Sequence, residues 1–123
     1  MIWGMILHPD GDWRLKEFGE PLHKTLGAAV GGYIEVVRPR GLPAPFVLIV
    51  NEEGRLLGLP VNPDASELYG FPEHGQPIVG TVVFLREEQT PEGMELAGLQ
   101  SRDLRSLLQL LVQARGERKG RRP

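Results

Sequence analysis

The sequence predicts an α+β domain, in which a mainly antiparallel sheet of five to six strands carries two main helices packed against it. Short apolar or alternating runs outnumber the helical patterns, which indicates a fold dominated by strands. Most of these runs are separated only by short turn segments, and such connections favour antiparallel pairing. The 123 residues include 16 glycines and 11 prolines, which favours many turns over a bundle of long helices.

The chain is expected to open with a hairpin and a helix. Residues 2–7 are an apolar run, typical of a buried strand, and residues 13–16 alternate as a half-buried strand does. The Pro- and Gly-containing segment between them suits a turn. A helix is expected over residues 21–30, because proline is tolerated at the first position and apolar residues then recur at helical spacing. Gly31 suits its C-terminal cap.

Four further strands are expected. Residues 33–37 are β-branched and aromatic, and residues 46–50 are apolar on both faces, which favours a central strand. After a turn that ends in glycine, residues 55–59 are expected to return as the second strand of a hairpin. Residues 78–85 form the strongest strand pattern in the chain. Gly80 within it indicates a bulge or a close backbone neighbour.

The remaining elements follow from helix-capping residues. Asn62 precedes a proline and an acidic residue, which is typical of a helix start, so a short helix is expected to end near Tyr69. The polar segment 86–93 is expected to be a loop. Ser101 is expected to cap a last helix with a leucine stripe, which Gly116 ends. One domain over residues 1–115 and a basic, flexible tail over 116–123 are therefore expected.

Composition excludes several classes of protein. Cysteine is absent, which excludes disulfides, cysteine–zinc sites, thiolate catalysis and iron–sulfur clusters. No apolar run reaches the length of a membrane span, and the first residues lack the basic segment of a secretory signal. A cytoplasmic protein without membrane contact is expected.

Patterns of catalysis are missing from the sequence. The three histidines do not stand at metal-ligand spacing, and no serine stands in a Gly-x-Ser-x-Gly turn. No glycine motif of a phosphate-binding loop follows a strand. We therefore expect no enzymatic activity, no cofactor and no metal.

A polar cluster around the turn after residue 50 is the candidate binding site. Its members are Tyr33, Glu35, Asn51, Glu52 and Asn62. Amides and carboxylates beside an aromatic ring could recognise a small, nucleotide-like ligand. A purely structural reading stays open, in which Asn51 bonds its own turn and Asn62 caps the following helix.

The C-terminal bases are a second candidate site. Residues 102–123 hold seven Lys or Arg and two acids, whereas the whole chain has a net charge of −2. Nucleic-acid contact could involve Arg115, Arg118, Lys119, Arg121 and Arg122. A basic helix end favoured by the helix dipole explains the same bias, and no aromatic residue is interleaved for base stacking. Nucleic acid is therefore not the expected partner.

Three sequence blocks carry a family resemblance. They are Val30-Gly31-Gly32-Tyr33-Ile34-Glu35-Val36-Val37, the segment from Asn51 to Asn62, and Ile78-Val79-Gly80-Thr81. In order and spacing they resemble the family of domain of unknown function 3846, over roughly residues 20–100. That family has no assigned activity, and its members are similar to small proteins carried by phages and plasmids. The resemblance implies a non-catalytic accessory protein that binds a host protein, in a regulatory or anti-defence role.

Overall fold

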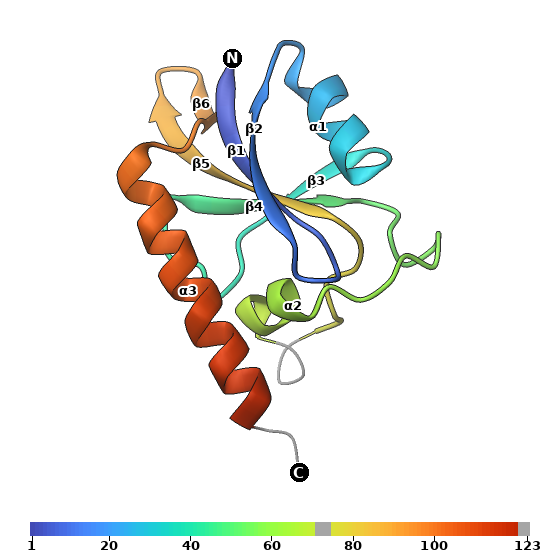
Figure 1. Cartoon of the computed structure of the whole chain (residues 1–123). Coiled ribbons are helices and arrows are strands. Elements are labelled where there is room, and N and C mark those ends of the chain that lie inside the picture. Colours follow the sequence, from blue (N-terminus) through green and yellow to red (C-terminus); the bar gives the residue numbers. More distant parts are fainter. Residues whose placement is uncertain (71–74, 121–123) are drawn as a thin grey trace.

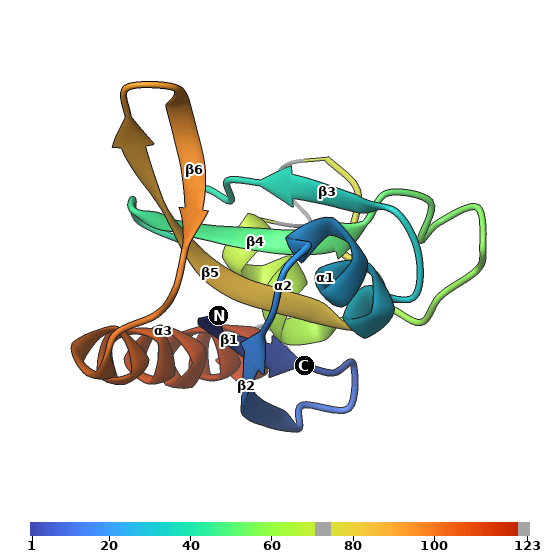
Figure 2. The same ribbon diagram turned by 90° about the horizontal axis from the view of Figure 1, so that it is seen from above.

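The computed structural model describes residues 1–70 and 75–120, which form a six-stranded antiparallel sheet with helices on both faces (Figures 1 and 2). The elements in chain order are β1 (Ile2–Leu7), β2 (Trp13–Phe18), α1 (Leu22–Val30), β3 (Ile34–Val37), β4 (Phe46–Asn51), α2 (Pro63–Tyr69), β5 (Val82–Thr90), β6 (Gly93–Ala97) and α3 (Ser101–Gly120). The strand order is β2-β1-β5-β4-β3, and β6 pairs with the second half of β5. The expected α+β class is confirmed, and the short α2 adds a third helix to the two main ones.

The centre of the sheet is β5, which pairs with β1 on one side and with β4 on the other. Val82 and Phe84 point to one face, Val83 and Leu85 point to the other, and all four side chains are fully buried. A strand buried on both faces needs a continuous apolar run, which is the pattern seen in the sequence. The strand expected at 78–85 is confirmed for residues 82–85.

Residues 78–81 precede this strand and do not belong to it. Val79 forms an isolated bridge with Val61, and Gly80 has a φ of +78°, a conformation that favours glycine. A Cβ atom at Gly80 would lie 2.8 Å from the Leu59 side chain. The neighbour that restricts this position is thus a side chain, whereas the sequence had suggested a bulge or a close backbone neighbour.

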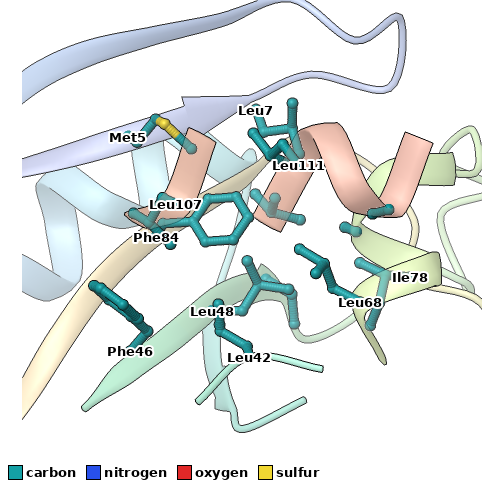
Figure 3. Close-up of a cluster of buried hydrophobic side chains, with 14 of the residues drawn as sticks. Met5, Leu7, Leu42, Phe46, Leu48, Leu68, Ile78, Phe84, Leu107 and Leu111 are labelled. Carbon is teal, nitrogen blue, oxygen red and sulfur yellow. The ribbon is translucent and has the colours of Figure 1, made fainter. Parts of the chain in front are cut away.

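Two hydrophobic cores lie on opposite faces of the sheet. One lies beneath α2 and α3, and the other lies beneath α1. Figure 3 shows Phe84 in the first core, where Met5 and Leu7 of β1 meet Leu107 and Leu111 of α3. The second core is built from buried side chains of β1, β2, α1, β4 and β5: Ile6, Phe18, Leu26, Val30, Val47, Ile49, Val83 and Leu85.

The expected strand at 55–59 is wrong. These residues form successive turns, in which the Leu57 N–H donates to the Glu53 carbonyl at 3.0 Å and the Gly58 N–H donates to the Arg55 carbonyl at 3.1 Å. The apolar residues made a strand plausible, but β4 already has β5 and β3 on its two sides. A returning strand has no free edge of β4 to pair with, and Leu56 at the turn is 87% exposed.

The expected loop at 86–93 is also wrong. β5 continues to Thr90 and forms a hairpin with β6, in a register that runs from Arg86↔Ala97 to Thr90↔Gly93. This hairpin extends beyond the helix-covered part of the sheet (Figure 2), so polar side chains are compatible with its strands. Arg38 donates from Nε and Nη2 to both carboxylate oxygens of Glu87, each at 2.6 Å, and this contact lowers the pKa of Glu87.

The last helix begins and ends differently from the expectation. Ser101 is its first residue, and the capping contact comes from Asp103, whose Oδ2 accepts from the Gln100 N–H at 2.7 Å. Gly116 does not end the helix, which continues to Gly120. A glycine inside a helix costs about 1 kcal/mol relative to alanine, and here the helix continues past it to Arg118, which pairs with Asp64.

Both ends of α3 are attached by arginine side chains. At its start, Arg86 Nε lies 3.3 Å from Asp103 Oδ2 and donates to the Gly98 carbonyl at 2.9 Å. At its other end, Asp64 of α2 accepts from Arg115 and Arg118. None of the described helices is long and apolar enough to cross a membrane.

Replacing Phe84 tests the central position of β5. Phe84→Ala is expected to lower the free energy of unfolding by about 3–5 kcal/mol, because it opens a cavity where β5 meets α3. A denaturant titration measures this loss. Met94→Ala on the exposed face of β6 is the control, with an expected loss below about 1 kcal/mol. A loss below about 1 kcal/mol for Phe84→Ala would contradict the central role of β5.

Candidate functional site

A hollow of about 310 Å³ lies between the β3–β4 pair, the C-terminal end of α2 and residues 75–79. Three of the five expected ligand-site residues line it, namely Glu35, Asn51 and Glu52. Arg55 and Tyr69 line it as well, although the sequence did not single them out. The turn at 52–58 brings Arg55 there, because it folds back on itself instead of returning as a strand.

Asn51 forms part of the wall of this hollow, and its amide is already satisfied by the protein. The side chain is buried, its Nδ2 donates to the Val30 carbonyl at 3.1 Å, and its Oδ1 accepts from the Glu53 N–H at 2.8 Å. It therefore fixes both the turn after β4 and the end of α1. This is the turn contact that the structural reading of the sequence anticipated, extended by a second bond.

Tyr33 and Asn62 lie outside the hollow. The Tyr33 side chain is 74% exposed and does not line it, although the Tyr33 carbonyl accepts from the Glu52 N–H at 2.8 Å. Asn62 is fully buried. Its Oδ1 accepts from the Ala65 N–H and caps α2, while its Nδ2 donates to the carbonyls of Leu7 and Gly80.

Three charged side chains that line the hollow have no partner among the described residues. Within residues 1–70 and 75–120, the side chains of Glu35, Glu52 and Arg55 make no hydrogen bond or ion pair. They surround a partly apolar floor to which Val50 and Ile78 contribute. Two carboxylates, a guanidinium and a tyrosine ring are therefore available to a small polar molecule. No group of three or more metal-ligating side chains is found in the part of the chain that the structure describes.

The described C-terminal bases are divided between ion-paired, half-buried side chains and solvent-exposed ones. Arg115 Nε donates to Asp64 Oδ2 at 2.9 Å, and Arg118 Nη2 donates to Asp64 Oδ1 at 3.0 Å. Arg115 Nη2 also donates to the Gly11 carbonyl at 2.8 Å, so it joins α3 to the turn between β1 and β2. Lys119 is exposed on α3. The other two candidates, Arg121 and Arg122, lie outside the described residues.

An apolar surface that the sequence reasoning missed lies between α3 and the β1–β2 edge of the sheet. Two neighbouring hollows make up this surface: one of about 620 Å³ is lined by α3 alone, and one of about 230 Å³ lies between Trp3, Leu15 and the start of α3, and Ser101 and Leu104 line both. We call it the apolar groove and define it by the side chains of Trp3, Leu15, Leu99, Leu104, Leu108 and Val112.

The register of the strands explains why this surface is uncovered. Met5 pairs with Leu15, so the odd-numbered side chains of β1 and β2 share the face that α3 covers. α3 reaches Met5 and Leu7 but does not extend over β2. Trp3 and Leu15 remain 47% and 41% exposed, and Val112 on α3 is 71% exposed.

A signal for the groove is present in the sequence. Apolar residues alternate with charged ones along β2, although β2 has no helix above it. Along α3, Leu104 and Leu108 pack partly against the core beside the buried Leu107 and Leu111, as the ordinary apolar stripe of one helix does. Val112 continues the row at the surface and is the apolar residue in excess of that stripe.

Comparison with known proteins gives one match. The family model described as Domain of unknown function (DUF3846) matches residues 2–109, which confirms the resemblance seen in the sequence. No curated protein and no solved structure matches the chain.

Asn62 is suited to a test that separates its cap from its other contacts. Asn62→Asp keeps the oxygen that caps α2, and a cap alone tolerates this change at little cost. The variant loses both bonds to the carbonyls of Leu7 and Gly80 and places a buried carboxylate against them. We expect the free energy of unfolding to fall by at least about 2 kcal/mol in a denaturant titration. Glu52→Gln, on the exposed turn, should change it by less than about 0.5 kcal/mol. A similarly small change in the free energy of unfolding for Asn62→Asp would show that only its capping contact stabilises the fold.

Proposed function

The chain belongs to the family of Domain of unknown function (DUF3846), whose description assigns no activity, and we propose that it acts without catalysis by binding another protein. The observation that supports this function is the apolar groove. Single exposed apolar side chains are normal on protein surfaces, whereas contiguous apolar patches mark interaction sites. Here Trp3 and Leu15 line one hollow, Leu108 and Val112 line the next, and Leu104 belongs to both.

The composition of the groove is that of a protein interface. Tryptophan is enriched among the residues that dominate binding energies, and Trp3 stands in the groove at half exposure. The rim is polar and neutral over most of its length, with Gln100 just before α3 and Gln109 and Gln113 on α3. An apolar centre with a polar rim is the usual arrangement of such surfaces.

The partner that we propose is a host protein, bound in the cytoplasm by an accessory protein of phage or mobile-element type. The family resemblance of the three sequence blocks supports this context. The role that this resemblance implies is regulatory or anti-defence.

Partner capture with surface variants tests the proposed function. The double variant Leu15→Asp with Val112→Asp is expected to keep its fold, because both side chains already contact water. It should lose proteins that the wild-type chain retains from a lysate of its host, as measured by quantitative mass spectrometry. Leu56→Asp with Leu57→Asp is the matched control, since both side chains are exposed and the pair adds the same two negative charges on the distant turn at 52–58. An unchanged set of retained proteins in the double variant would contradict the proposed function.

A second candidate function is the binding of a small, nucleotide-like ligand. The supporting observation is the hollow of about 310 Å³, where Glu35, Glu52 and Arg55 have no partner among the described residues. The carboxylates can accept hydrogen bonds from ribose hydroxyls or base amines, and the guanidinium can pair with a phosphate. The ring of Tyr69 provides a flat surface beside them.

Two conservative substitutions test the second candidate. A nucleotide that binds in the hollow raises the melting temperature of the wild-type protein, because binding to the folded state stabilises it. Glu52→Gln is expected to abolish that shift, and Tyr33→Phe is expected to preserve it, because Tyr33 does not line the hollow. A thermal-shift screen of nucleosides and nucleotides measures both effects. The second candidate is refuted if no compound of the screen stabilises the wild type, or if Glu52→Gln leaves the shift intact.

A further inference from the structure

We propose that the apolar groove binds an amphipathic α-helix of the partner, with an acidic side chain of that helix opposite Arg105. This inference rests on the proposed protein-binding function and specifies the segment that is bound. It follows from the shape of the groove and from one unpaired charge at its rim.

The shape of the groove suits a helix. Its α3 wall consists of residues between Ser101 and Gln113 that recur every three or four positions. Such a row is straight and, at about 1.5 Å per residue, roughly 18 Å long. A second helix packs against a row of this kind by placing its own side chains in the spaces between turns.

The opposite wall favours a helix over an added strand. Trp3 and Leu15 project from β1 and β2 toward the α3 side of the sheet, and Figures 1 and 2 show the β1–β2 hairpin beside α3. A strand added at the edge of β2 would extend the sheet away from α3 and leave Val112 uncovered. Edge strands that carry charged residues also resist pairing with another chain, and Arg14 and Lys16 stand on β2. A helix laid between α3 and β2 covers both walls.

One charged residue at the rim indicates which side chain the partner helix should carry. Among the residues that line the two hollows, Arg105 alone is charged. Within residues 1–70 and 75–120 it makes no ion pair or hydrogen bond through its side chain, whereas Arg115 and Arg118 on the same helix both pair with Asp64. A guanidinium beside an apolar surface selects a carboxylate, because charge-assisted bonds are stronger there than in open water.

Selection from a peptide library tests this inference on the full chain. The probe is a phage-displayed library of random 16-residue peptides, selected against the wild-type protein and counter-selected against the Leu15→Asp/Val112→Asp variant. We expect the enriched peptides to carry apolar residues at i, i+3 or i+4, and i+7, with an acidic residue beside them. Their binding should shift the fluorescence of the protein to shorter wavelength, because Trp3 is half exposed in the groove.

A matched pair of charge reversals tests the role of Arg105. For the enriched acidic peptides, Arg105→Glu should weaken binding at least tenfold. Arg102→Glu should weaken it less than twofold, because Arg102 lies one turn away on α3 and lines neither hollow. Equal effects of the two reversals would overturn the assignment of Arg105.

Other outcomes would contradict the proposal that the groove binds a helix. Enriched peptides without helical spacing, basic enriched peptides, or no enrichment would each contradict the inference. Concentration-dependent dimers in sedimentation that Leu15→Asp/Val112→Asp abolishes would assign the groove to a second copy of this chain. If host proteins are still captured through the groove while no helical peptide is enriched, the proposed function stands and this inference fails.

Discussion

The fold depends on one constraint, which is that consecutive side chains of β5 must enter two different cores. Val82 and Phe84 complete the core beneath α2 and α3, while Val83 and Leu85 complete the core beneath α1. β5 also joins the β1–β2 hairpin to the β3–β4 pair through its two edges. A shift of its register by one residue would exchange the side chains of the two cores, so the alternation specifies the register as well as the burial.

The sequence predicted those parts of the fold that are determined by local pattern. The apolar run at 46–50 and residues 82–85 are buried on both faces, and such runs are visible without knowledge of their neighbours. The strand expected at 55–59 fails for a non-local reason, since β3 occupies the side of β4 where that strand would pair. The β5–β6 hairpin was missed because most of its residues are polar and only partly buried or exposed, and they carry no apolar alternation.

In the candidate sites, too, local sequence patterns identify some contacts, whereas others depend on distant segments of the chain. Asn62 is recognisable as a cap from the residues that follow it, but its bonds to Leu7 and Gly80 depend on segments that only the folded chain brings together. Tyr33 was grouped with Glu35 by proximity in sequence, yet its side chain is turned away from the hollow. The apolar groove could not be predicted from β2 or α3 alone, because it arises where α3 covers β1 and stops short of β2.

The arginine contacts at both ends of α3 have a kinetic consequence. Asp103 with Arg86, and Asp64 with Arg115 and Arg118, fix the helix that forms one wall of the groove before any partner arrives. A surface that is already ordered loses little entropy on docking. Binding of the proposed partner would then need no rearrangement of α3, and rate constants of about 10⁵–10⁷ M⁻¹s⁻¹ are usual for such association. Differences in affinity between alternative partners would therefore lie mainly in the dissociation rate constant. The lifetime of each complex would then decide which partner replaces another.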